Sequence, residues 1–234
     1  MKLAEIEKRY RYKFPKLFIQ LWQEGMLDWM NGRTAPFGKN ESWANTIYPK
    51  IKDNPPLLLH SGGFDFELLR AEEMLDFQFD ELWDVEKHEF VPFAKTDEGN
   101  VYAFYKNKKS EDGENVIVHI WNDMNETEII AKNFEDFIFR KMLEAIYDVD
   151  EDDLKGDYQD GGFDAYRLDL LNDLKTIKPY LNPIYSKILT ELYGRETPLK
   201  SLFSYGLIEK KELVDITQEH LFFNELDSIF EHEL

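Results

Sequence analysis

The chain has 234 residues, of which 43% are hydrophobic and 15% aromatic, so it contains enough apolar material for a packed core. Its formal net charge is −19, from 28 Lys and Arg against 47 Asp and Glu, which argues against nucleic acids and membranes as partners and favours basic proteins. The chain contains no cysteine, which excludes disulfides, thiolate nucleophiles and cysteine-bound zinc.

No run of the chain approaches the roughly 18 apolar residues of a membrane-spanning helix. The segment that starts at Met1 becomes charged again at Glu5, and the apolar stretch of a signal peptide does not follow. We therefore expect a cytoplasmic protein.

The charge is unevenly placed along the chain. The first twenty residues are net positive, whereas residues 65–98 contain twelve acidic side chains against three basic ones. Residues 148–164 contain eight acidic side chains against Lys155 alone. Acidic blocks of this kind form interaction surfaces, and solvated faces or linkers produce them as well.

The N-terminal part predicts two short helices. The first covers residues 3–12, and Pro15 begins the second, in which apolar residues recur at helical spacing from Leu17 to Trp22. Gly25 is expected near the end of the second helix. Residues 31–55 are rich in Gly, Asn and Pro and predict an irregular loop.

Residues 57–60 and 66–69 each predict a short strand. Ala71, Leu75, Phe79 and Leu82 follow at helical spacing and predict a helix over residues 71–82. The acidic side chains between them would form its solvated face.

The centre of the chain predicts a β-meander. Strands are expected at residues 89–94, 101–105, 116–121 and 128–131, with polar turns at residues 97–100 and 110–114, and Pro92 marks an edge or a bulge. Asn133 is expected to cap a helix that runs to about Tyr147, with Asp136 as its capping-box partner. The apolar face of that helix would be Phe134, Phe137, Ile138 and Met142.

The C-terminal part predicts an acidic linker and short helices. Residues 148–160 are interpreted as a linker or an exposed loop, and the first helix, with Leu168, Leu171 and Leu174, stops before Pro179. A second helix begins at Asn182-Pro183, carries Ile184, Ile188 and Leu192, and ends at Gly194. A third is expected over residues 197–206, and residues 209–234 are expected to be helical as well.

Residues 3–147 carry an ordered series of short motifs. The series begins with Phe14-Pro15, the aromatics Phe18 and Trp22, and Asn31-Gly32. It continues with Phe90-Val91-Pro92-Phe93-Ala94, Asp97-Glu98-Gly99 and Val101-Tyr102-Ala103-Phe104, and it closes with Val116 to Trp121 and Asn133-Phe134-Glu135-Asp136-Phe137. In this order and spacing the stretch resembles the SMI1/KNR4 family, also called the SUKH superfamily. Arg11-Tyr12-Lys13 stands where the family often has a glycine, and residues from Asp148 onward have no counterpart in the pattern.

The resemblance implies an α+β fold with a twisted, mainly antiparallel sheet flanked by helices. It places a family-like domain at residues 1–147 and leaves residues 148–234 as an acidic linker with a helical C-terminal extension. It also implies protein binding rather than catalysis, because the family has no common catalytic residues. Many bacterial members look like immunity proteins that neutralise a polymorphic toxin, often a nuclease, whereas fungal members regulate cell-wall synthesis.

Three constellations that suggest chemistry have simpler readings. Asp148, Asp150 and Asp152 match the first ligands of an EF-hand loop, but Asp153 and Gln159 stand where that loop needs Gly and Glu. His119 lies in a strand and is expected to face a neighbouring side chain, and His60-Ser61 lacks the nucleophile-elbow glycines and is expected in a turn. No nucleotide-binding motif occurs, so no cofactor or metal is expected.

Glu72 and Asp76 lie one helical turn apart, but on a solvated face their pKa values would stay ordinary, which does not suit acid–base catalysis. We therefore expect a non-catalytic protein that binds a basic toxin domain through its acidic surface, and the alternative is a regulatory scaffold of cell-wall synthesis or signalling. The oligomeric state is left open. The expected partner-binding residues are Glu72, Glu73, Asp76, Asp80, Asp97, Glu98, Asp148, Asp150, Glu151, Asp152 and Asp153.

Overall fold

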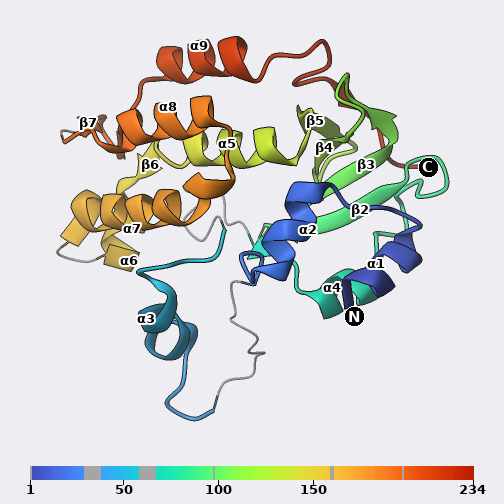
Figure 1. Ribbon diagram of the computed structural model, residues 1–234, viewed down its shortest axis with the longest axis horizontal. Coiled ribbons are helices and arrows are strands. Elements are labelled where there is room, and N and C mark those ends of the chain that lie inside the picture. Colours follow the sequence, from blue (N-terminus) through green and yellow to red (C-terminus); the bar gives the residue numbers. More distant parts are fainter. Residues whose placement is uncertain (1, 29–37, 58–66, 97, 159–160, 197) are drawn as a thin grey trace. The chain divides into compact units, whose positions relative to one another are not determined.

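The computed structural model describes residues 2–28, 38–57, 67–96, 98–158, 161–196 and 198–234 (Figure 1). Packing divides the chain into two compact units, each made of segments that are far apart in sequence. The first unit contains Met1–Gln20, Asp65–Arg140 and Thr217–Leu234, and the second contains Leu21–Phe64 and Lys141–Ile216. The expected boundary after residue 147 concerns where the family-like domain ends, and it stays a prediction.

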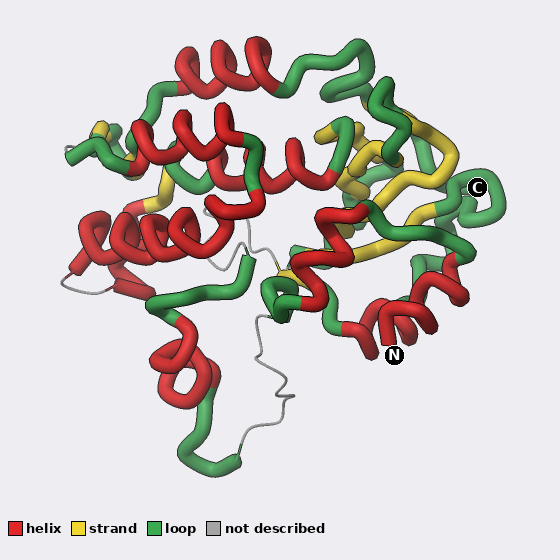
Figure 2. Tube along the Cα trace, viewed as in Figure 1, coloured by secondary structure: helices red, strands yellow, loops and turns green. Residues whose placement is uncertain are grey.

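The first unit is built on an antiparallel sheet. In the described part of the chain this sheet has six strands in the order β1-β2-β3-β4-β5-β9, and every neighbouring pair is antiparallel. Figure 2 shows its longer strands in yellow. The strands are β1 (Glu67–Leu68), β2 (Phe90–Lys95), β3 (Val101–Lys109), β4 (Asn115–Ile120), β5 (Thr127–Ala131) and β9 (Ile229–Phe230). The predicted meander and the α+β fold with a mainly antiparallel sheet are confirmed.

Pro92 lies in a β-bulge, as one of the two sequence alternatives predicted. β2 pairs with β1 on one side and β3 on the other, so it is not an edge strand. The register of β2 against β3 shifts between Pro92 and Ala94. A bulge lets a residue without an N–H sit inside a sheet, because the ladder is already interrupted there.

Both faces of the sheet are covered by apolar side chains. On one face Phe104 of β3 packs its ring 5.5 Å from Phe18 of α2 (Lys16–Gln23), 4.9 Å from Phe93 and 5.7 Å from Phe134 of α5 (Phe134–Glu144). On the other face Trp83 and Phe230 pack against a buried cluster of β2 to β5 side chains. The alternation of side chains along each strand therefore feeds two separate layers of core.

The N-terminal helices follow the sequence closely. α1 spans Lys2–Tyr10, and α2 begins directly after Pro15 and buries Phe18. Gly25 has a φ of +75° just beyond the end of α2, a conformation that glycine adopts without steric cost.

The helix predicted over residues 71–82 is half as long as expected. α4 spans only Ala71–Asp76, and the backbone of Phe77 leaves the helical region at ψ 127°. The rings of Phe77 and Phe79 pack on the cluster around Trp83, and Leu82 is exposed. Residues 77–82 therefore form a loop that packs on the sheet, and their apolar residues do not mark a helical face. The helix prediction was wrong for these residues.

Asn133 caps α5 as predicted. The backbone N–H of Asp136 donates to Asn133 Oδ1 at 2.8 Å. Phe134, Phe137, Ile138 and Met142 are all buried, which confirms the predicted face.

The second unit begins with a stretch that was predicted to be irregular. Within residues 38–57 the structure has a π-helical turn at Trp43–Ile47 and α3 at Tyr48–Ile51. Asn45 and Ser42 exchange backbone-to-side-chain hydrogen bonds of 2.6 and 3.3 Å, and Pro49 lies in the first turn of α3, where its missing N–H costs nothing. The loop prediction was therefore wrong for residues 43–51. Leu57 is buried outside any strand, and Leu58 to His60 lie outside the described residues.

The described part of the expected linker at residues 148–160 forms secondary structure. It contains β6 (Val149–Asp150) and α6 (Glu151–Tyr158). Leu154 is buried and anchors α6, although one aliphatic side chain among charged residues gave no periodic signal. The interpretation as a linker or exposed loop was wrong for residues 149–158, because a polar helix with one buried face resembles a solvated segment in sequence.

The next two helices were predicted, but with different apolar faces. α7 spans Gly162–Ile177 and buries Tyr166, Leu170 and Leu174, whereas Leu168 is exposed. α8 spans Pro183–Tyr193, follows the Asn182 cap and ends at Gly194, as expected. Ile184 at its start is exposed.

The remaining segments differ from the helical prediction. β7 (Leu199–Lys200) and β8 (Ser204–Gly206) form a hairpin, and β8 also pairs with β6. α9 spans Lys210–His220, and residues after it continue into turns and β9. Among the helices that the structure describes, none has the length and apolar character needed to cross a lipid bilayer.

Candidate partner-binding surfaces

The first acidic block is partly neutralised by the basic N-terminus. Helix α1 packs near α4, and Lys2 forms an ion pair with Glu72. Arg9 and Tyr10 of α1 donate to the carbonyl oxygens of Phe77 and Met74. Two charge blocks that are about 70 residues apart in sequence therefore meet in the first unit.

Glu73 is held by Arg70, three residues before it. Its carboxylate accepts from the Arg70 backbone N–H at 2.8 Å and from the guanidinium at 3.0 and 3.1 Å. Burial raises the pKa of Glu73, but the hydrogen bonds from Arg70, together with the charges of Arg70 and Lys95, outweigh burial and bring the pKa below its ordinary value. Glu73 therefore caps α4 and has little charge left for a partner.

Asp76 and Asp80 are exposed carboxylates of this region. Asp76 ends α4, and Asp80 lies in the following loop, where its Oδ1 accepts from the backbone N–H of Leu82 at 2.8 Å. Glu98 is exposed in the turn between β2 and β3, and Asp97 lies outside the described residues. The predicted set in the first unit is thus spread over a helix, a loop and a turn.

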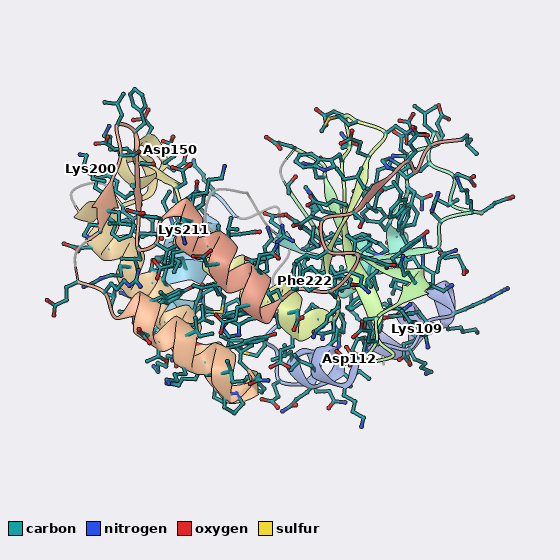
Figure 3. All side chains as sticks on the ribbon, turned by 90° about the horizontal axis from the view of Figure 1, so that it is seen from above. Lys109, Asp112, Asp150, Lys200, Lys211 and Phe222 are labelled. Carbon is teal, nitrogen blue, oxygen red and sulfur yellow. The ribbon has the colours of Figure 1, made fainter. Side chains whose placement is uncertain are left out.

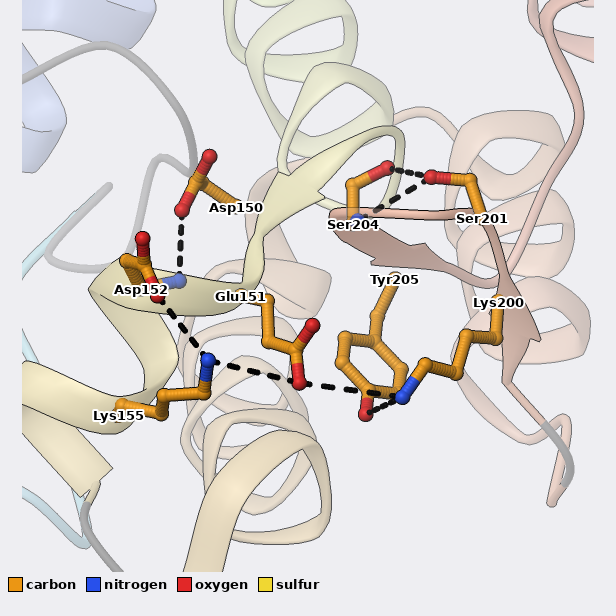
Figure 4. Close-up of polar contacts among 8 residues, drawn as sticks. All are labelled: Asp150, Glu151, Asp152, Lys155, Lys200, Ser201, Ser204 and Tyr205. Atoms are coloured by element: carbon orange, nitrogen blue, oxygen red, sulfur yellow. Dashed lines mark hydrogen bonds and ion pairs between the residues drawn. The ribbon is translucent and has the colours of Figure 1, made fainter.

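The second acidic block forms the start of α6 (Figure 4). Asp150 Oδ1 accepts from the backbone N–H of Asp152 at 2.6 Å, which is the geometry of an N-terminal cap. Glu151, Asp152 and Asp153 occupy the first turn, where carboxylates interact favourably with the helix dipole. The local role of the block is therefore to begin a helix, while Asp150, Asp152 and Asp153 remain exposed.

Two lysines pair with this block. Lys155 Nζ lies 3.0 Å from Asp152 Oδ1 and 3.6 Å from Glu151 Oε1, and Lys200 Nζ lies 3.8 Å from the same Glu151 oxygen. Lys200 also donates to Tyr205 Oη at 2.8 Å, and this hydrogen bond followed by the charge of Glu151 raises the lysine pKa. Figure 3 shows Asp150 and Lys200 at the same end of the second unit. Exposed pairs of this kind contribute little stability, so they remain exchangeable for a partner's charges.

Asp148 links the acidic block to the hairpin. Its φ of +54° turns the chain into β6, and its carboxylate accepts a hydrogen bond from Ser204 Oγ. Ser201 and Ser204 exchange further hydrogen bonds across the turn of the hairpin. The structure thus brings Asp148, Asp150, Glu151 and Asp152 together beside a hairpin that sequence reasoning did not foresee.

Sequence reasoning also missed two buried carboxylates in the second unit. Asp169 and Asp173 lie one turn apart on α7 and are 7% and 6% exposed. Tyr48 donates to Asp169, and burial, followed by this hydrogen bond and the Asp169 charge, raises the tyrosine pKa. The sequence pattern that could have indicated their burial is their position on the same helical face as Tyr166 and Leu170, where a solvated aspartate is not expected.

The histidines and carboxylates that the structure describes do not form a metal centre. No group of three or more potential ligands comes together within the described ranges. His119 stacks on Tyr102 with ring centroids 4.6 Å apart, as predicted for a strand histidine that faces a neighbour. His60 lies outside the described residues.

A groove along α8 carries polar groups that are used in structural contacts. Lys178 Nζ donates to Thr190 Oγ1 at 3.0 Å, and Ser186 Oγ donates to the Lys178 carbonyl oxygen at 3.2 Å. The Lys178 ammonium and the Ser186 hydroxyl are therefore already engaged in hydrogen bonds within this part of the fold.

Comparison with known protein families identifies a match. Residues 2–140 match the family model described as SMI1 / KNR4 family (SUKH-1). No curated protein and no solved structure matches the chain. The matched segment covers more than half of the sequence and ends within α5.

Proposed function

The chain belongs to the SMI1/KNR4 family (SUKH-1), and from this premise we propose that it is an immunity protein that neutralises a basic toxin domain by binding it. Members of this family are generally non-catalytic, and SUKH domains are often immunity proteins. Family membership is the observation that carries the proposal. The acidic surface indicates that the partner is basic.

The charge distribution supports a basic partner. With a net charge of −19, the chain attracts cationic surfaces and repels polyanions. Both effects act over distances up to about the Debye screening length. A toxin that acts on nucleic acid has a basic substrate-binding surface. Carboxylates that cover such a surface occupy the positions that substrate phosphates would take, so association inhibits the toxin.

Asp148, Asp150 and Asp152 are the residues we assign to steering in the second unit. All three are exposed, and they lie on one short stretch around the start of α6. Their hydrogen bonds use single oxygens of each carboxylate, which leaves acceptor capacity toward solvent. Asp76 and Asp80 are the corresponding residues of the first unit.

Growth rescue tests the proposed function directly. Each toxin domain encoded in the genome that carries this gene is expressed in a bacterial host, with and without this chain. We expect this chain to restore growth for a basic toxin domain and to form a complex with the purified domain. If no toxin domain is rescued, the chain is not an immunity protein.

Charge-removing variants then test the mechanism. Asp148→Asn, Asp150→Asn and Asp152→Asn remove three charges, while Asn at position 150 keeps the cap and Asn at 148 tolerates a positive φ. The triple variant is expected to slow association about tenfold at low salt and to flatten its salt dependence. Asp76→Asn with Asp80→Asn is the matched change in the first unit. Unchanged association and salt dependence in both variants would contradict the electrostatic mechanism.

A further inference from the structure

The turn of the β7–β8 hairpin exposes two large apolar side chains. Leu202 is 78% exposed and Phe203 is 69% exposed, and Leu199 at the start of the hairpin is also exposed. The Ser201 N–H donates to the Ser204 carbonyl oxygen at 2.9 Å, so Leu202 and Phe203 occupy the two central positions of the turn. We call these three residues the hairpin tip.

The local structure does not require these residue types. Central turn positions favour Gly, Asn, Asp, Ser or Pro, because those residues supply the backbone angles or hydrogen bonds of a turn. Neither Leu202 nor Phe203 has a positive φ, and their side chains lie mostly in solvent. Single exposed apolar residues are ordinary, but adjacent ones at the end of a hairpin form a protruding apolar surface.

The backbone of the tip is held from three sides. The Phe203 carbonyl oxygen accepts from the Glu151 N–H at 2.8 Å, and β8 pairs with β6 at Tyr205 and Ser204. The Ser204 N–H donates to Ser201 Oγ at 3.1 Å, and Ser204 Oγ donates to Asp148. A tip that is fixed in advance loses little conformational entropy when a partner covers it.

Negative charge surrounds the base of the hairpin. The contacts to Asp148 and Glu151 place the tip directly beside the start of α6, where Asp150 and Asp152 are exposed (Figure 3, Figure 4). Lys200 lies in the same region, and its charge is already engaged by Glu151 and Tyr205. An apolar centre with a charged rim is the arrangement of a protein-binding surface.

We propose that the hairpin tip is the apolar anchor of the partner interface, inserting Leu202 and Phe203 into an apolar pocket of the basic toxin domain. The exposed carboxylates of the α6 start then meet the Lys and Arg residues that rim this pocket. This inference rests on the proposed function. It specifies where this chain contacts the toxin, and it specifies that the toxin's surface has an apolar pocket with a basic rim.

The charge around the hairpin tip favours a basic protein as the partner over a lipid surface or a second copy of the chain. An anionic lipid surface would be repelled by the carboxylates next to the tip, so membrane insertion is disfavoured. A second copy would bring two chains of charge −19 together, which opposes self-association. A basic protein gains from both the apolar centre and the acidic rim.

The test uses the toxin domain that this chain rescues and the variant Leu202→Ser with Phe203→Asn. Both new residues suit turn centres, so the variant is expected to keep the melting temperature of the wild type. The matched control is Leu168→Gln with Ile184→Gln, which removes two side chains of 60% and 55% exposure from α7 and α8. Titration calorimetry is expected to show binding at least about thirtyfold weaker for the tip variant and within about twofold for the control.

Kinetics separate the tip from its rim. Loss of the apolar anchor is expected to raise the dissociation rate and to leave the salt dependence of association intact. The triple Asn variant at 148, 150 and 152 is instead expected to slow association and flatten its salt dependence, with the dissociation rate little changed. A tip variant that binds within twofold of the wild type, in a pair that shows rescue, overturns the inference and leaves the proposed function standing. Absence of any rescue overturns the proposed function, and the assigned occupant with it.

Two further measurements address the other occupants. Wild-type chain is mixed with phosphatidylcholine vesicles that contain phosphatidylglycerol, and its self-association is followed by sedimentation. We expect neither vesicle binding nor dimers. Vesicle binding or dimerisation that disappears in the tip variant would assign the hairpin to a membrane or to a second copy and overturn the proposal.

Discussion

Individual carboxylates in this protein differ in how much charge they offer to a partner. Glu73 is enclosed by the Arg70 backbone and guanidinium, whereas the Asp152 side chain is 90% exposed with one lysine beside it. The sequence identifies both as acidic residues in an acidic block, but it contains no sign of the pairing of Glu72 with Lys2 across 70 positions. The charge of a candidate surface was therefore predictable, whereas its net accessible charge depended on long-range packing.

Two buried histidines hold the C-terminal segment against the sheet. His88 and His232 are 5% and 0% exposed, and their Nδ1 atoms lie 2.9 Å from Tyr105 Oη and 3.0 Å from Thr127 Oγ1. Burial lowers the pKa of both rings, and Lys87 adds to the effect at His88 while His88 adds to it at His232. Asp84 and Glu233 oppose these shifts without cancelling them.

This pair predicts a loss of stability at mildly acidic pH. The unfolded chain takes up protons at about pH 6.5, before the folded chain does, so the free energy of unfolding falls as pH drops below that value. Urea unfolding between pH 7.5 and 5.5 measures it. His232→Asn is expected to reduce the pH dependence relative to the wild type, and Gln218→Asn, an exposed exchange without a titratable group, is the control that should not. Equal pH dependence in all three proteins would contradict the assignment.

Local elements were predictable where their signals lie within a few residues. The meander was found because alternating strands are separated by Gly99 and Gly113, which have φ values of +91° and +79° in their turns. The hairpin of β7 and β8 and the strand β9 were missed because they pair with β6 and β5, and strands of two or three residues carry no periodicity. The hairpin tip was missed for a different reason, since Leu199, Leu202 and Phe203 follow the spacing of one face of a helix in sequence.

The cap of α5 gives a prediction at the scale of one helix. Asn133→Ala removes the acceptor for the Asp136 N–H and is expected to lower the free energy of unfolding by about 1 kcal/mol. Asn133→Ser keeps a side-chain acceptor and is expected to retain most of this stability. Urea denaturation compares the variants. An alanine variant as stable as the wild type would show that Asn133 does not cap the helix in solution.

At the scale of the whole molecule, the first unit depends on residues from three regions of the chain. Its last segment supplies β9, and Phe223 and Phe230 pack on the sheet beside Trp83. Arg140 of α5 donates to Asp227 Oδ1 at 2.8 Å. The sequence predicted this segment as a helix, because the apolar residues that cover a distant sheet face need no regular spacing.

Removing residues 221–234 is therefore expected to damage the first unit. The deletion uncovers β5 and one face of the core, and we expect the free energy of unfolding to fall by more than about 3 kcal/mol. Thermal melts with a dye that reports exposed apolar surface measure the effect. Leu234→Ser, at a side chain that is 88% exposed, is the control. A deletion variant that melts like the wild type would show that β9 does not stabilise the sheet.

The assembly of the first unit from segments far apart in the chain has a consequence during protein synthesis. The strands β1 to β5 leave the ribosome well before β9, and residues 132–228, most of them in the second unit and α9, are translated in between. At translation rates of roughly 5 to 20 residues per second, the nascent sheet waits for on the order of 5 to 20 s with β5 uncovered. During that time the sheet face around Trp83 is a natural target for a chaperone, and a ribosome that stalls within α9 would release a chain whose sheet is incomplete.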